Sequence, residues 1–142
     1  MHQFSHWGQM GNGVTRMKYP LHKNDTGSFQ ELAHASDVQF GQLSLLTVAP
    51  RCKRGGHYHK RKVEWFCCVH GKCHIALSTP EGAQVTSYSL DDESKEFVIV
   101  RPDQVHIVLN PYDRECELLV ISSEEYDPEN TDTIKYKGGD NR

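Results

Sequence analysis

Two histidines separated by a single residue, His57 and His59, form the clearest chemical motif of the chain. On an extended strand, residues two apart share a face, so both imidazoles can reach one cation. The carboxylate of Glu64 can return to the same point if the chain bends around residues 60–62. A fourth ligand must come from elsewhere, and His106, in an apolar and strand-like setting, is the best candidate.

Three imidazoles and one carboxylate suit a divalent ion of zinc, iron, nickel, manganese or copper, and availability decides the ion as much as affinity does. Zinc is the favoured ion. Because the chain has nine histidines in 142 residues, a His-x-His pair can also arise without any function. The two preceding glycines, the spaced Glu64 and the distant His106 favour a metal site over that alternative.

The segments that must position these ligands are predicted to be strands. About nine short runs rich in Val, Leu, Ile and Thr are separated by turn residues, and no long helical pattern competes with them. We therefore expect one all-β domain, a β-sandwich or jelly roll, whose interior forms a pocket. Besides the stretch around His57, the expected strands are 28–33, 42–49, 63–70, 73–78, 83–90, 97–100, 105–109 and 116–121.

The regions around these strands complete the expected organisation. Residues 1–24 are predicted to be an N-terminal arm, 25–134 the domain and 135–142 a C-terminal tail. Residues 51–54 are expected to form a basic loop, and residues 70–72 a hairpin turn built on a glycine.

The charges are distributed unevenly along the chain. The formal net charge of −3 argues against general affinity for nucleic acid, yet residues 51–62 carry six basic side chains and no acid. Acids gather instead at 91–93 and 124–132. A basic rim beside a metal pocket suits a small anionic ligand such as a diphosphate, with Lys53 and Arg54 as contacts. The alternative is an ordinary solvated loop.

The cysteines and the hydropathy indicate the compartment. Five cysteines make an odd number without a disulfide framework, the first residues lack the apolar core of a signal peptide, and no apolar run approaches the ~20 residues that span a bilayer. We expect a soluble cytoplasmic protein without membrane contact.

The residues proposed as ligands also match a known family. They fit the first cupin motif, in which His-x-His is followed by Glu and then Gly, and the second motif, Pro-x-Gly-x-x-His-x-x-x-Asn, is partly present. Arg51 stands where the first motif normally begins with Gly, and the Gly of the second falls at Asp103 or Gln104. The chain thus resembles the cupins, which implies a single jelly-roll β-barrel; the matching residues are His57, His59, Glu64, Gly71, Pro102, His106 and Asn110.

Among cupins, the chain is most similar to the C-terminal domain of bifunctional capsular-polysaccharide enzymes that act on UDP-linked 4-keto-6-deoxy N-acetylhexosamines. The similar stretches include 25–29, 54–59 and 124–133, although Thr26 replaces an arginine that is usual in related dTDP-sugar enzymes. The resemblance implies epimerisation or isomerisation of a nucleotide-diphosphate sugar in surface polysaccharide biosynthesis, and a homodimer. The reductase domain that accompanies the family cupin is not in this sequence, which implies a stand-alone enzyme.

This activity requires proton transfer at C3, next to the C4 ketone. A base removes the proton to leave an enediolate and an acid returns it, while the metal either stabilises that intermediate or serves the fold. The catalytic candidates are His34, Tyr58 and His74, with His70 as a further one. Glu31 is a candidate for both proton transfer and substrate binding.

Two other functions fit the same residues. A mononuclear-iron cupin dioxygenase would use Trp65, Phe66 and the cysteines to line a less polar pocket. A metal-stabilised sugar-binding module would bind its ligand without catalysis.

Overall fold

The computed structural model describes residues 14–137, which form twelve strands and no helix. None of the described residues belongs to a helix that could cross a membrane. The strands are β1 (Arg16–Met17), β2 (Leu21–Asn24), β3 (Gly27–Gln30), β4 (Gln42–Val48), β5 (Cys52–Tyr58), β6 (Glu64–His70), β7 (Lys72–Ser78), β8 (Thr86–Asp91), β9 (Phe97–Val100), β10 (Val105–Asn110), β11 (Cys116–Ser122) and β12 (Ile134–Lys135).

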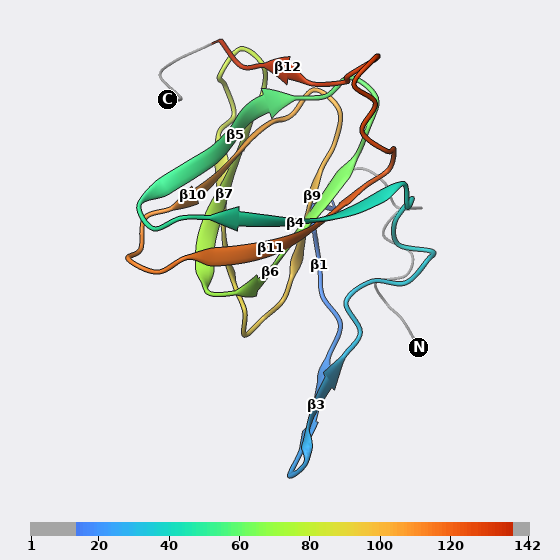
Figure 1. Ribbon diagram of the computed structural model, residues 1–142, viewed down its shortest axis with the longest axis vertical. Helices are drawn as coiled ribbons and strands as arrows, with labels where there is room; N and C mark the ends of the chain where they lie inside the picture. The colour runs from blue at the N-terminus through green and yellow to red at the C-terminus, as the bar shows by residue number, and fades with distance from the viewer. Residues whose placement is uncertain (1–13, 138–142) are drawn as a thin grey trace.

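Two five-stranded antiparallel sheets face each other (Figure 1). The β6 sheet has the strand order β1-β9-β6-β11-β4, and the β5 sheet has the order β12-β5-β10-β7-β8. The main hydrophobic core fills the space between them with alternate side chains of both sheets, among them Val48, Phe66, Ile75, Leu90, Val100, Val108 and Leu118. The predicted all-β jelly-roll fold is confirmed.

Alternation along β6 divides its side chains between two environments. Phe66 and Cys68 belong to the core between the sheets, whereas Trp65 and Cys67 point to the outer face. There they belong to a second apolar cluster, which includes Met17 of β1, and against which Leu32 and Val38 of the segment before β4 pack. Both faces of this part of the β6 sheet are therefore buried.

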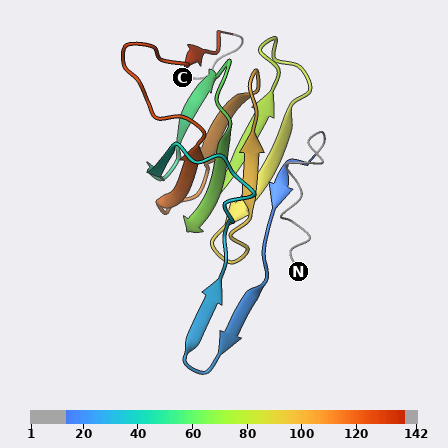
Figure 2. The same ribbon diagram turned by 90° about the vertical axis from the view of Figure 1, so that its right-hand side faces the viewer.

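The β2–β3 hairpin extends away from the two sheets (Figures 1 and 2). Its turn contains Thr26, whose backbone N–H donates to the side chain of Asn24 at 2.9 Å, as expected of turn chemistry at this point. Phe29 is 67% exposed and Leu21 48% exposed. The hairpin thus presents apolar side chains to solvent.

Two local predictions were wrong. Residues 70–72 do not close a hairpin, because β6 and β7 lie in different sheets, and Gly71, with φ of +79°, turns the chain from one sheet to the other. A Cβ at Gly71 would meet the carbonyl oxygen of Glu115 at 2.9 Å. Residues 51–54 are not a loop, because β5 begins at Cys52, which pairs with Asn110 at the end of β10.

The division into arm, domain and tail remains a prediction. β1 and β2 fall within the predicted arm 1–24, and β1 pairs with β9. The rest of that arm before residue 14, and the tail beyond residue 137, lie outside the described residues.

Candidate metal centre

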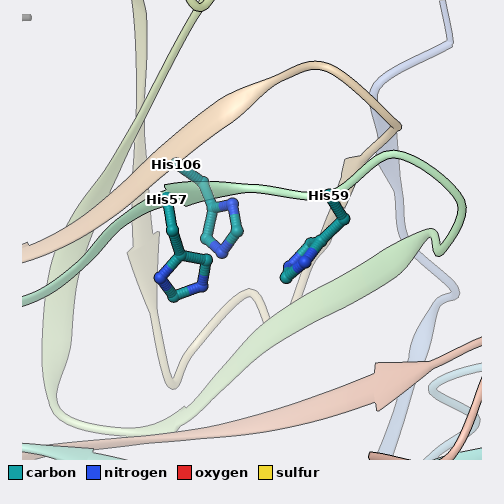
Figure 3. Close-up of side chains that lie close together, drawn as sticks. All are labelled: His57, His59 and His106. Carbon is teal, nitrogen blue, oxygen red and sulfur yellow. The ribbon is translucent and has the colours of Figure 1, made fainter. Parts of the chain in front are cut away.

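Three histidines from two neighbouring strands point toward one another in the interior (Figure 3). His57 lies on β5, His59 follows directly after that strand, and His106 lies on β10 opposite His57. One ring nitrogen of each lies within 4.8 Å of the others. The structure therefore brings together three side chains that the sequence indicated as ligands, one of them 47 residues further along the chain than His59.

A bulge in β5 directs His57 inward. Arg54 pairs with Val108 and Ile107 pairs with Gly55, but the next pair is His106 with His57, so Gly56 is an extra residue. An extra residue reverses the alternation of side chains, which lets Arg54 and His57 line the same pocket although they are three residues apart. A Cβ at Gly55 would meet the carbonyl oxygen of His106 at 2.7 Å. Only glycine permits this approach of the two strands.

Two positions near the proposed ligands adopt left-handed backbone although they are not glycine. They are Arg51, where the first cupin motif has glycine, and Asp103, one of the two candidate glycine positions of the second, with φ of +63° and +67°. The backbone N–H of Asp103 donates to the carbonyl of His59 at 2.8 Å, which joins the turn before β10 to a ligand. A left-handed backbone is the conformation that glycine adopts most readily, so glycine would fit at both positions.

Glu64 lies beside the imidazoles at the start of β6. Its Oε1 atom is 3.1 Å from Nε2 of His59 and 3.4 Å from Nε2 of His106. The bend at residues 60–62 returns the chain as the sequence predicted. Its carboxylate is close enough to share a cation with these two rings.

Burial and mutual contact decide the charges in this cluster. Burial lowers the pKa of His106 to about 3, and burial together with the neighbouring His59 lowers the pKa of His57. Burial alone would lower the pKa of His59, but its hydrogen bond and attraction to Glu64 outweigh it and raise that pKa. Burial would raise the pKa of Glu64, yet His59 and His106 lower it overall. Two rings are thus neutral at pH 7 beside a carboxylate.

This donor set fits a divalent cation. Neutral imidazoles offer lone pairs, and the carboxylate supplies negative charge. The Nδ1 atom of His59 lies against the carbonyl oxygen of Asp132, so it must carry the proton in the neutral ring. Its Nε2 lone pair then faces a carboxylate oxygen of Glu64, and only a proton or a cation between them removes the repulsion. The buried ring of His106 also directs its Nε2 atom at the same carboxylate oxygen, at 3.4 Å.

A pocket of about 250 Å³ opens beside the cluster. His57, Glu64 and His106 form its polar part, and Arg54 contributes a cationic side chain. The rest of the wall is largely apolar and comes from facing strands of both sheets, with Leu46, Phe66, Val108 and Val120. The site can therefore hold a small ligand that is partly polar and partly apolar.

The structure does not bring the other predicted residues of β5 to β7 to this pocket. Lys53 pairs with Leu109 on the outer face of the β5 sheet, and Tyr58 alternates with the two inward histidines. His70 is exposed at the end of β6. The ring of His74 contacts the hydroxyls of Tyr112 at 3.1 Å and Ser89 at 3.2 Å, on the outer face. Their functional roles remain predictions; the residues concerned are Lys53, Tyr58, His70 and His74.

His34 and Glu31 belong to a separate network beyond the outer face of the β6 sheet. Nε2 of His34 contacts the carboxylate of Glu31, and its Nδ1 lies 3.2 Å from the hydroxyl of Tyr19. That hydroxyl donates to Asp37 at 2.6 Å, and the backbone N–H of His34 donates to the same carboxylate at 2.8 Å. The roles predicted for His34 and Glu31 also remain predictions.

Sequence reasoning missed Asp132 and most of the apolar wall. Asp132 is 6% exposed and contacts the loop of residues 60–62. Burial would raise its pKa, but the three backbone N–H donors of this loop lower it overall. Its position within an acidic stretch suggested a solvated surface, and no local pattern distinguishes it. Phe66, by contrast, was indicated as a pocket residue for the dioxygenase alternative, and it shares a face with Glu64 on β6.

Known proteins share this fold. A variant of the sugar 3,4-ketoisomerase QdtA from Thermoanaerobacterium thermosaccharolyticum, in complex with TDP-4-keto-6-deoxyglucose, has a TM-score of 0.73 at 21% identity, over 87% of this chain and 88% of that one. The capsular polysaccharide assembling protein CapF from Staphylococcus aureus has a TM-score of 0.66 at 25% identity, over 84% of this chain but 34% of CapF.

The sequence comparisons point the same way. A UDP-2-acetamido-2,6-beta-L-arabino-hexul-4-ose reductase of Pseudomonas aeruginosa is 26% identical over 148 residues, which is 93% of this chain and 39% of that enzyme. The chain therefore spans well under half of this relative and of CapF. The sequence model of the polysaccharide biosynthesis C-terminal domain family matches residues 22–134, and the chain belongs to that family.

Proposed function

We propose that this chain is a metal-binding cupin enzyme that epimerises or isomerises a nucleotide-activated 4-keto-6-deoxy sugar in surface polysaccharide biosynthesis. The observation that carries the proposal is the convergence of His57, His59 and His106 beside a pocket that His57, His106 and Arg54 line. The TDP-4-keto-6-deoxyglucose in QdtA, and the names of CapF and of the Pseudomonas reductase, support the class of substrate.

The proposed cofactor is one zinc ion, with iron, nickel or manganese as alternatives. His57, His59 and His106 would hold it, and Glu64 would be the fourth ligand because its Oε1 atom lies within 3.4 Å of two of the rings. A bound divalent cation supplies Lewis-acid stabilisation of negative charge that develops on a ketone oxygen.

The pocket walls fit the two ends of such a substrate. The guanidinium of Arg54 would pair with the diphosphate, which accepts hydrogen bonds from two of its N–H groups at once. The apolar side chains of Leu46, Phe66 and Val120 would contact the C6 methyl group that distinguishes a 6-deoxy sugar, and would exclude water from the reacting carbon. Lys53 and Glu31 remain proposed contacts from the sequence alone.

One observation favours a second candidate function, a metal-stabilised sugar-binding module. Among the described residues that line the pocket, the titratable side chains are Arg54 and the proposed ligands His57, Glu64 and His106. An epimerase needs a base and an acid in addition to the ligands. His34, Tyr58 and His74 remain the proposed candidates for these roles, although none of them lines the pocket.

Solvent-proton exchange distinguishes the two functions. The protein, loaded with zinc, is incubated in deuterium oxide with UDP- and dTDP-linked 4-keto-6-deoxy sugars, and the sugars are analysed by NMR and mass spectrometry. We expect deuterium at C3 of at least one sugar. Binding of a sugar without any exchange would favour the binding module. The absence of both binding and exchange would exclude both functions.

We also propose that the protein is a cytoplasmic homodimer. The compartment rests on the cysteines, all of which are free thiols in the structure. The dimer rests on two exposed apolar surfaces, the β2–β3 hairpin with Phe29 and the outer face of edge strand β4, where Leu43 is 55% and Leu45 60% exposed. Light scattering should give twice the chain mass, and Leu45→Glu should give monomers. A monomeric wild-type protein would refute the dimer.

A further inference from the structure

The segment between β11 and β12 passes beside the loop that carries the metal ligands. After β11 the chain returns to pair β12 with β5, so that Ile134 lies opposite Tyr58 and Lys135 opposite His57 (Figure 1). Asp132, just before β12, is thereby placed against the bend between β5 and β6. It is 6% exposed, whereas residues 125–131 are exposed.

The carboxylate of Asp132 accepts hydrogen bonds from three consecutive backbone N–H groups. Oδ1 accepts from Lys60 at 2.8 Å, and Oδ2 accepts from Arg61 at 2.7 Å and from Lys62 at 2.9 Å. Such bonds to a charged acceptor are stronger than bonds between neutral groups. Without this carboxylate, three amides of a tight bend would lose their acceptor.

The backbone carbonyl of the same residue contacts a metal ligand. It lies against Nδ1 of His59, and because a carbonyl only accepts, the imidazole must donate. The neutral His59 then has its proton on Nδ1 and its lone pair on Nε2, the atom that lies 3.1 Å from Glu64. The second nitrogen of a histidine ligand commonly makes such a bond, which sets the ring's tautomer and orientation.

We infer that Asp132 is a positioning residue of the metal site: its carboxylate fixes the bend of residues 60–62, and its carbonyl holds His59 with Nε2 directed at Glu64. The expected effect on metal affinity rests on the proposed metal site, whereas the hydrogen bonds of Asp132 do not depend on it. The C-terminal segment is thus a part of the site and not only a covering for it.

The variant Asp132→Asn tests this role. Its amide keeps the size of the carboxylate but places an NH₂ donor against at least one backbone N–H. We expect a mixture of His59 tautomers in the folded, metal-free protein, seen by ¹⁵N NMR of the ring at pH 8, and a zinc affinity about tenfold to a hundredfold weaker. Glu125→Gln removes an equal charge from an exposed site of the same segment and should change neither.

Two results would overturn the inference. A merely structural Asp132 would give a folded variant with a lower melting temperature but with an unchanged His59 tautomer and unchanged zinc affinity. A measurement on the wild type tests the inference even if the variant does not fold. The Nδ1–H proton of His59 should be observed and protected from exchange with solvent, and a wild type without this proton would contradict the hydrogen bond to Asp132. If the wild type shows this proton but binds no metal, the proposed metal site fails while the positioning geometry stands.

Discussion

Two clusters of histidine and carboxylate side chains lie on opposite sides of the β6 sheet, and they differ in how their polar atoms are paired. In the outer cluster, the hydroxyl of Tyr19 and the backbone N–H of His34 both donate to Asp37, and the ring of His34 contacts Glu31. In the inner cluster, His57, His59 and His106 direct ring nitrogens at one another and at Glu64.

The difference teaches how to separate a structural network from a candidate metal site. In the outer cluster a hydroxyl and a backbone N–H already donate to Oδ2 of Asp37, although its Oδ1 atom is buried without a hydrogen-bond partner among the described residues. Lone pairs converge in the inner cluster, where burial keeps His57 and His106 neutral. The inner side chains are also more buried, with 3% of His59 and 14% of Glu64 exposed against 24% of His34 and 41% of Glu31. Similar residue types therefore predict different chemistry in the two places, and the predictions below test that contrast.

The largest expected effect is the loss of metal from the inner cluster. His57→Ala removes one of the three convergent imidazoles, and we predict that it lowers zinc affinity by more than about a hundredfold. Loss of a proposed ligand should cost more than loss of a residue that only hydrogen-bonds to a ligand, which typically costs about tenfold to a hundredfold. Metal analysis of protein purified without chelator should show the loss. Chelator should lower the melting temperature of the wild type much more than that of the variant.

The outer cluster supplies the matched control. His34→Ala also removes a partly buried imidazole beside a carboxylate, and it should leave the metal content at one ion per chain. Equal metal loss from both variants, or from neither, would contradict the contrast between the clusters.

The next effect concerns the cationic side chain of the pocket. Arg54→Ala should raise the KM for a nucleotide-diphosphate sugar about tenfold to a hundredfold, because a charge-assisted hydrogen bond contributes about 1.5–3 kcal/mol. Steady-state kinetics measures it. Lys72→Ala removes a cation at the start of β7, outside this pocket, and should leave KM unchanged. An unchanged KM in Arg54→Ala would remove the diphosphate assignment.

A smaller effect is expected in the outer cluster. Tyr19→Phe deletes the hydroxyl that donates to the buried Asp37, and should lower the free energy of unfolding by about 1–3 kcal/mol. Urea denaturation measures this loss. Metal content should not change, and a variant with wild-type stability but reduced metal would reverse the roles assigned to the two clusters.

The smallest effect is a pH dependence on the outer face of β6. Burial raises the pKa of Cys67 from 9.0 to about 12, so the folded protein retains a proton that the unfolded chain releases near pH 9. This contribution to stability is complete below pH 9 and is lost as the pH rises. When the pH rises from 8 to 9.5, the free energy of unfolding of Cys67→Ala should fall by about 1 kcal/mol less than that of the wild type. Parallel stability curves would show that the thiol is not held protonated.

Part of this site could be predicted from the sequence because its proposed ligands obey local rules. His57 and His59 share a face by strand alternation, and the bend at residues 60–62 returns Glu64 to them. His106 was indicated by its apolar setting and by the partial second motif. The all-β fold followed from short alternating runs and turn residues, which are also local features.

The remaining features depend on contacts between distant segments. The bulge at Gly55 and Gly56 exists because β10 approaches closely, and it reverses the direction of His57 in a way that the sequence does not reveal. His70 to Lys72 has the composition of a hairpin, but the pairing partners of β6 and β7 place these strands in opposite sheets. The direction of His34 likewise depends on Tyr19 and Asp37.

The most direct test of the inner site is an anomalous diffraction map at the zinc absorption edge, from crystals of protein purified without chelator. We predict one peak per chain among His57, His59 and His106, at about 2.0–2.1 Å from one ring nitrogen of each. No peak at this position in crystals with zinc in the solution, or a peak at His34 and Glu31 instead, would contradict the account.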